Sequence, residues 1–290
     1  MEHLTPAIVT VGLATMVAIV GMPHGGLDHL FGRELFRPRF GAFWVVVFGL
    51  AYLGTAGLVL LGWFVAPTLT VVLFFLISAI HFGDEENVRQ PLRAVEGGMV
   101  IWVPLLFRQS EVAELLAWVV PGGDPERTRA GIIAAQPLLW AIAIFFIANL
   151  MVCNRITSAV RNMAFFTLFV FAPTLVSFVV YFCGWHSTRE LMELTRRAYP
   201  LSPWRGLRRV MITAAPMAGL AVAATAAAAW WFSGDRGLPP VLVQAVFLGL
   251  SAVAVPHILL HAAARNYGAD PFTQESGVLR TPPSPVRAIS

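Results

Sequence analysis

Apolar runs close to twenty residues long recur along almost the whole 290-residue chain. Because about 20 apolar residues in a helix span the hydrocarbon core of a bilayer, such runs predict transmembrane α-helices. The composition agrees, since 57% of the residues are hydrophobic and only 12% are charged. We therefore predict an all-α fold, a polytopic integral membrane bundle folded as one unit over residues 1–265. The expected spans are residues 6–22, 41–66, 68–82, 131–153, 163–184, 210–232 and 240–264.

Residues 97–120 are ambiguous, because two apolar stretches flank the polar sequence Arg108-Gln109-Ser110-Glu111. The segment is either one crossing with charges at its middle or a re-entrant hairpin of two half-length helices. A hairpin leaves 16 arginines on one side of the membrane and 3 on the other, with Arg108 uncounted at its tip, whereas a crossing gives 12 and 8. Since cytoplasmic loops are rich in basic residues, we predict seven transmembrane helices plus a hairpin. The N-terminus is then outside the cell membrane and the C-terminus is in the cytoplasm.

Histidines lie at or near the ends of several apolar segments, where an ionisable group is costly and indicates a functional site. His24 lies in a stretch with one proline and three glycines, which interrupt a helix and allow close backbone approach. In the hairpin topology His24, His81, His186 and His257 all lie towards the cytoplasmic ends of their helices. A single histidine at a helix end is more often an interfacial residue. Together, these four predict convergence on one metal ion near the cytoplasmic side.

Spacing suggests further ligands. His186 and Glu190 are four residues apart and share one face if the helix continues, which suits either metal chelation or an ordinary His–Glu hydrogen bond. His257 and His261 have the same spacing, and we expect His261 to face the lipid headgroups. Imidazole-rich sites without thiolates suit iron, zinc or copper.

Composition also excludes some functions. The chain has no lysine, so it cannot hold retinal as the Schiff base of an opsin. The positive charge is all arginine in loops between helices, which membrane orientation explains, and we expect no nucleic acid as a partner. The two cysteines, Cys153 and Cys183, are predicted to be apolar filling in helices. We expect no cleavable signal peptide, because the N-terminus lacks a basic region before its first apolar run.

Four motifs resemble, in order and spacing, those of the Brp/Blh-type β-carotene 15,15′-dioxygenases. These are prokaryotic integral membrane proteins that make retinal for microbial rhodopsins. The motifs are Pro23-His24-Gly25-Gly26-Leu27-Asp28-His29, His81-Phe82-Gly83, Trp185-His186-Ser187-Thr188-Arg189 and Pro256-His257-Ile258-Leu259-Leu260.

The resemblance implies an iron(II) centre that uses O2 to cleave the central double bond of β-carotene into two molecules of retinal. It implies His24, His81 and His186 as iron ligands, and a functional link to a microbial rhodopsin. The family motif ends in another histidine, and this chain has Glu190 at that position. We expect Glu190 to be the fourth ligand.

Three residues near these motifs are predicted in secondary roles. His257 is either an additional metal ligand or a group that supports the ligands, and Asp28 and His29 are candidates for the supporting role. Many of the 21 phenylalanines are expected in ordinary core and lipid contacts, and some can line a site for a conjugated polyene taken from the bilayer. Residues 266–290, rich in Pro, Ser and Thr, are predicted to form a disordered cytoplasmic tail.

Two alternatives remain open from the sequence. One is a membrane hydroxylase or desaturase that acts on another carotenoid or lipid with two irons, the second held by acids such as Asp84, Glu85 and Glu86. The other is a non-enzymatic partner of a rhodopsin that handles carotenoid or retinal.

Overall fold

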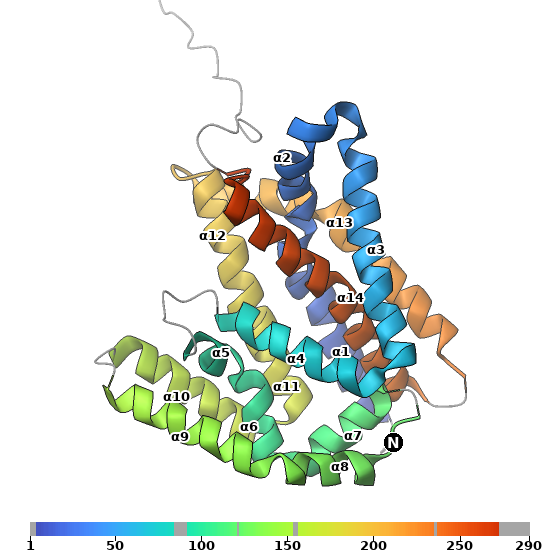
Figure 1. The fold of residues 1–290 in the computed structure, drawn as a ribbon, viewed down its shortest axis with the longest axis vertical. Coiled ribbons are helices and arrows are strands. Elements are labelled where there is room, and N and C mark those ends of the chain that lie inside the picture. The colour runs from blue at the N-terminus through green and yellow to red at the C-terminus, as the bar shows by residue number, and fades with distance from the viewer. Residues whose placement is uncertain (1–3, 84–91, 121, 153–155, 235–236, 273–290) are drawn as a thin grey trace, which may run out of the picture.

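The computed structural model describes residues 4–83, 92–120, 122–152, 156–234 and 237–272 (Figure 1). Within these residues every regular element is helical, which confirms the predicted all-α class. The α-helices are α1 (Leu4–Met16), α2 (Asp28–Phe40), α3 (Trp44–Val65), α4 (Pro67–Gly83), α5 (Leu92–Gly97), α6 (Met99–Phe107), α7 (Gln109–Val119), α8 (Pro125–Ala134), α9 (Gln136–Val152), α10 (Ile156–Phe171), α11 (Thr174–Val179), α12 (Thr188–Ala198), α13 (Pro203–Trp231) and α14 (Leu238–Tyr267). Shorter elements of other helical types are the π-helical η1 (Val17–Gly21) and η4 (Val180–Ser187) and the 3₁₀-helical η2 (Met22–Leu27) and η3 (Gly41–Phe43).

Three helical stretches of the described chain are long and apolar enough to cross a membrane, namely Ala7–Val65, α13 and α14. A fourth results if α8 and α9, which meet at 53°, count as one bent span. These helices indicate a membrane protein, but the predicted number of seven spans is not confirmed. Helix α4 illustrates why, because its 17 residues extend only about 25 Å, less than the hydrocarbon core of about 30 Å.

Two predicted spans are broken helices in the structure. The span predicted over 163–184 ends as α10 at Phe171 and resumes as α11 after Pro173. Proline has no backbone N–H and clashes with the preceding turn, which favours a break at this position. Proline does not end every helix of this chain, since α13 and α14 continue through Pro216 and Pro256. The span predicted over 131–153 begins in α8 and continues in α9 beyond the bend.

Helices α6 and α7 meet at Arg108, so residues 97–120 do form two half-length helices. Their outer ends lie at different levels of the bundle. Gly97 is so close to the backbone of Gly83, at the end of α4, that an added Cβ would overlap it. At the other end, the Val119 carbonyl accepts a hydrogen bond from Gln244, near the start of α14. The two ends therefore pack against different elements, and entry and exit on the same side of the membrane stays a prediction.

The charges at the middle of this segment are paired inside the protein. Glu111 accepts hydrogen bonds from Arg108 Nε at 2.6 Å and from the Thr174 backbone N–H at 2.7 Å. Because the charges are satisfied locally, the bend at Arg108 does not have to reach water. Helix α8 lies at the end of the bundle opposite the turn between α2 and α3 (Figure 1). The side of the membrane predicted for its arginines stays a prediction.

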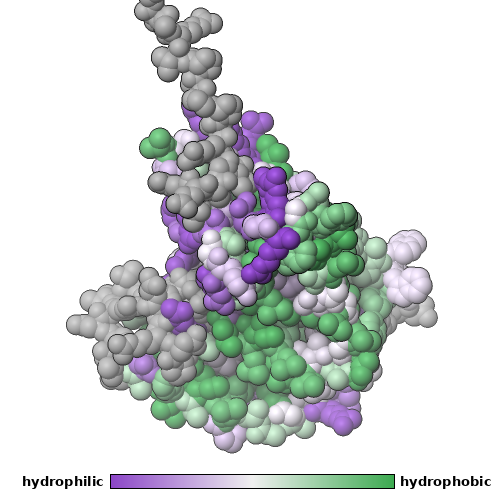
Figure 2. All heavy atoms as spheres, turned by 45° about the horizontal axis from the view of Figure 1, so that its top comes forward, coloured by the Kyte–Doolittle hydropathy of each residue, from purple (hydrophilic) through white to green (hydrophobic). Residues whose placement is uncertain are grey.

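The chain reverses between α2 and α3 at Gly41, where a φ of 53° favours glycine. Arginines gather at this end of the molecule, where Arg39 lies over the Tyr267 ring and Arg197 pairs with Asp270 at 3.5 Å. Figure 2 shows polar residues towards this end and a largely apolar surface over the rest of the visible face.

The end of the described chain is packed rather than loose. Phe272 is buried, and its ring lies 5.8 Å from that of Phe31 in the core formed by α2, α12, α13 and α14. The tail predicted from residue 266 therefore starts with a structured segment, and residues 273–290 lie outside the described part of the chain.

Candidate active site

Four histidine rings from distant parts of the sequence meet inside the bundle. We call His24, His81, His186 and His257 the four-histidine cluster. The ring centroids are 5.3 Å apart for His24 and His186, 5.1 Å for His81 and His186, and 5.5 Å for His257 with each of His24 and His81. Their planes cross at 71–88°. Three of the rings are buried and His81 is half-buried.

Irregular helical turns present two of these histidines. Helix α1 passes into the π-helical η1 and then into η2, which carries His24, before α2 begins. Pro23 lies at the start of η2, where its missing N–H and its ring disfavour a continued α-helix. The second π-helical segment, η4, carries His186 and packs against η1. Such π turns occur frequently at functional sites.

A close backbone contact fixes η2 against α13. Gly26 lies so near the Ala214 carbonyl that any side chain at this position would collide with it. Glycine is therefore needed here for its lack of a Cβ, and the contact holds the turn that carries His24.

Hydrogen bonds define which nitrogen of two cluster rings is free for other chemistry. Nδ1 of His24 donates to the Gly21 carbonyl, and Nδ1 of His257 donates to Asp28 Oδ1 at 2.7 Å. In each neutral ring Nε2 then carries the lone pair. Ligating histidines commonly donate their other ring N–H to a carbonyl or a carboxylate in this way.

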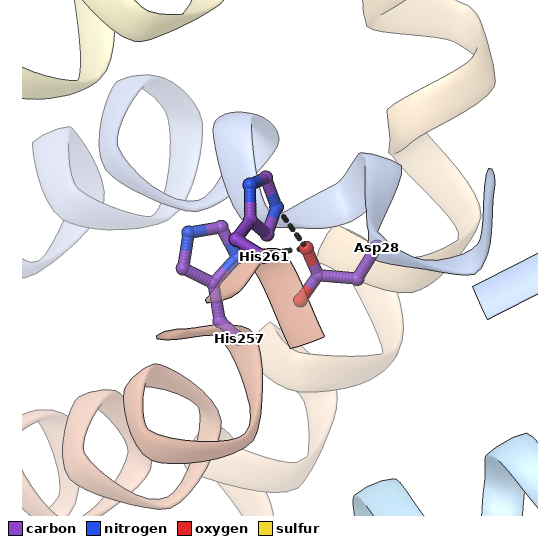
Figure 3. Close-up of side chains that lie close together, drawn as sticks. All are labelled: Asp28, His257 and His261. Atoms are coloured by element: carbon purple, nitrogen blue, oxygen red, sulfur yellow. Dashed lines mark hydrogen bonds and ion pairs between the residues drawn. The ribbon is translucent and has the colours of Figure 1, made fainter. Parts of the chain in front are cut away.

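Asp28 is fully buried. We call Asp28, Tyr52, His257 and His261 the Asp28 network, and Figure 3 shows Asp28 with the two histidines. Its Oδ1 accepts from His257 and also lies 3.2 Å from His261 Nε2. Its Oδ2 accepts from the Tyr52 hydroxyl at 2.8 Å. The two histidines come from α14, Tyr52 comes from α3 and Asp28 begins α2, so one carboxylate joins three helices.

The donor set fits a metal ion. A metal–nitrogen bond of about 2.1 Å places two imidazole centroids roughly 5 Å apart around one tetrahedral ion, close to the separations in the cluster. Among the described residues, the group with three ligand atoms within 4.8 Å of one another is nevertheless Asp28, His257 and His261, rather than the predicted ligands His24, His81 and His186. The cluster rings must therefore turn towards an ion for their nitrogens to share it.

Three predictions near the cluster have different outcomes. Glu190 follows His186 by one turn, on α12, and is half-buried; its role as a ligand stays a prediction. His29 Nδ1 lies 3.0 Å from the Gly26 carbonyl, and in the described residues no hydrogen bond or ring contact joins His29 to the cluster. Asp84, Glu85 and Glu86 lie outside the described residues.

His261 does not face the lipid headgroups, which corrects its prediction. Its ring packs 4.1 Å from Phe31 and 4.2 Å from His257, and it reaches Asp28. The four-residue spacing from His257 places both rings on one face of α14, and that signal was visible in the sequence. Tyr52 was missed altogether, although a phenol within an apolar helix usually has a hydrogen-bond partner.

An apolar cavity of about 490 Å³ opens from the cluster. Three helical segments contribute stripes of lining residues at helical spacing, and each stripe ends on a cluster histidine. These stripes are Phe74, Ser78 and His81 on α4; Thr174, Phe178, Phe182 and His186 on α11 and η4; and Phe247, Leu250, Ala254 and His257 on α14.

The cluster lies at one end of this cavity. On all three segments the histidine or the residue after it is the last to line the cavity. From His257 back to Phe247 is ten residues of α14, or about 15 Å. The site can therefore take an elongated apolar molecule and present part of it to the histidines, away from bulk water.

Comparison with known proteins points to one family. The family model described as "Beta-carotene 15,15'-dioxygenase" matches residues 15–263. The beta-carotene 15,15'-dioxygenase of the uncultured marine bacterium 66A03 is 28% identical over 264 residues, which cover 84% of this chain and 90% of that protein. The probable beta-carotene 15,15'-dioxygenase Blh of Halobacterium salinarum is 27% identical over 297 residues, which cover 88% of this chain and 84% of that protein. No solved structure matches this chain.

Proposed function

Because the chain belongs to the β-carotene 15,15′-dioxygenase family, we propose that it cleaves the central double bond of β-carotene with O2 to give two molecules of retinal. The observation that carries this proposal is the position of the four-histidine cluster at the end of an apolar cavity. Retinal formed here would be available to a microbial rhodopsin, since this chain has no lysine to retain it.

We propose that the cluster binds iron(II) through His24, His81, His186 and His257. Bound there by neutral imidazoles, iron(II) would supply the activation of dioxygen beside an alkene. The ring contacts of His257 with His24 and His81 support it as the fourth imidazole. Glu190, the ligand expected from the motif, remains the competing fourth ligand.

The other role of the protein is to bind the polyene and to exclude water from the site. Aromatic rings such as Phe182, which stacks on His186 at 5.7 Å, and Phe82, at 4.7 Å from it, surround the metal side of the cavity. They place the polyene against the histidines and keep water away from the reacting bond. The apolar helices allow β-carotene to enter from the lipid bilayer.

The test is expression in a bacterial host that makes β-carotene. We expect the orange colour to fade and retinal to accumulate, whereas cells expressing His81→Ala stay orange. Persistent colour in cells with well-inserted wild-type protein, and no aldehyde in the extracts, would refute cleavage of this substrate.

Iron content separates the two candidates for the fourth ligand. We expect purified His257→Ala to lose most of its iron, and Glu190→Gln to keep about one iron per chain. The reverse result would assign the position to Glu190.

We propose an orientation in the cell membrane with the N-terminus outside and the C-terminus in the cytoplasm. The arginines near the ends of α2, α12 and α14 support it, because basic residues favour the cytoplasmic side. His257 is eight residues from Arg265 on α14, or about 12 Å, which favours a metal centre towards the cytoplasmic side. Reporter fusions at successive loops test this orientation and the seven crossings expected from the sequence.

A further inference from the structure

The Asp28 carboxylate has its acceptor capacity divided between its two oxygens. Oδ1 faces the two histidines of α14, at 2.7 Å and 3.2 Å, and Oδ2 faces Tyr52 at 2.8 Å. The side chain is 0% exposed. A buried carboxylate is costly unless it is hydrogen-bonded, so these three donors account for its presence in the bundle.

The direction of each hydrogen bond determines what His257 can do. A carboxylate accepts only, so His257 presents Nδ1–H and His261 presents Nε2–H to Asp28. The second nitrogen of His257 is then on the side of the ring away from Asp28, and this ring contacts His24 and His81. Tyr52 also lies 3.2 Å from the Val253 carbonyl, one turn before His257, so it reaches both the carboxylate and the helix that carries the ligand.

We propose that Tyr52 and His261 are positioning residues of the metal centre, which act through Asp28 to hold His257 towards the cluster. This inference rests on the proposed function, because it takes the cluster as the iron site. The Tyr52 hydroxyl holds Oδ2, and His261 shares Oδ1, so the carboxylate cannot turn and release Nδ1 of His257. Groups that orient metal ligands in this way change metal affinity by about 10–100-fold when they are removed.

A direct second metal site at Asp28, His257 and His261 is the main competing explanation, since these three offer ligand atoms within 4.8 Å of one another. The distances favour hydrogen bonds. Two ligands at about 2.1 Å from one tetrahedral ion lie roughly 3.4 Å apart, whereas Oδ1 and His257 Nδ1 are 2.7 Å apart.

The experiment is a titration of metal-stripped, detergent-solubilised full-length protein with Co(II), followed by its visible d–d absorption. This readout does not depend on carotenoid turnover. We expect wild type and Tyr267→Phe, whose phenol is exposed and outside the network, to bind one ion per chain with the same affinity. Tyr52→Phe should bind one ion at least tenfold more weakly, with a shifted absorption band.

A pair of variants at His261 tests the same idea if Tyr52→Phe folds poorly. His261→Gln keeps an N–H donor for Asp28 and should stay within about threefold of wild type. His261→Leu removes the donor and should weaken binding at least tenfold.

Different results overturn different statements. If wild type binds no metal, the proposed iron site fails. If wild type binds one ion and Tyr52→Phe and His261→Leu match it in affinity and spectrum, only the positioning role fails. Two ions per chain, with one lost in Asp28→Asn, would establish the second site in place of the hydrogen-bonded network.

Discussion

Replacing Gly26 with alanine should loosen the turn that presents His24. The added Cβ would meet the Ala214 carbonyl oxygen, and its carbonyl carbon at 3.0 Å, and both belong to the backbone of α13. A backbone group cannot rotate away as a side chain can, so η2 must move off α13. Overpacking of this kind costs about 1–3 kcal/mol. Loss of glycine flexibility returns only about 0.5–1 kcal/mol, so the net effect is destabilising.

The assay is thermal unfolding in detergent together with iron content. A domain of 150–250 residues loses about 2–4 °C per kcal/mol, so the expected drop for Gly26→Ala is several degrees. Gly25→Ala is the matched control, because its Cβ would find its nearest atom, His257 Nδ1, at 3.9 Å, an ordinary contact. Equal melting temperatures and equal iron content for the two variants would refute the role assigned to the Gly26–Ala214 contact.

Two further substitutions test the cavity and the bend at Arg108. Leu250→Phe adds bulk to the α14 stripe and should slow β-carotene cleavage at least tenfold while leaving iron content unchanged. The control is Leu259→Phe on the same helix, which should cleave at the wild-type rate because Leu259 is 57% exposed. Normal turnover in Leu250→Phe would mean that the polyene lies elsewhere. Glu111→Gln weakens the contacts to Arg108 and to α11 and should lower the unfolding free energy by about 1–2 kcal/mol in denaturant titrations, since both charged groups are partly exposed. Glu114→Gln, on the exposed side of α7, should stay within about 0.5 kcal/mol of wild type, and equal losses in both variants would remove the case for Glu111.

The helical class and the meeting of the four histidines follow from local features of the sequence. Apolar runs of this length fold as helices in lipid, and His24, His81, His186 and His257 stand out because an imidazole is costly among apolar residues. To predict that these histidines form one group, it was enough to assume that the ends of their segments lie at one level of the membrane. The ring contacts agree with that expectation.

Features that depend on tertiary contacts were harder to predict. The inward turn of His261 depends on the position of Asp28, which arrives from another helix. The two half-length helices of residues 97–120 were predicted, but the contacts of Glu111 with Arg108 and with the Thr174 backbone depend on another helix and were not. The break at Pro173 also depends on its surroundings, because Pro216 and Pro256 lie inside α13 and α14 without ending them.

The π-helical segments η1 and η4 have a consequence for how the protein tolerates insertions and deletions. A π turn is an α-helix that accommodates one additional residue, so deletion of a single residue from either segment would let a regular α-helix form. The helices on either side would keep nearly their present rotation about the axis, because the wider turn had already absorbed the additional residue. Within the turn itself each side chain would shift by about 100°, and His186, the seventh residue of η4, lies in that turn. The additional residue of η4 is therefore part of what directs His186 into the shared interior.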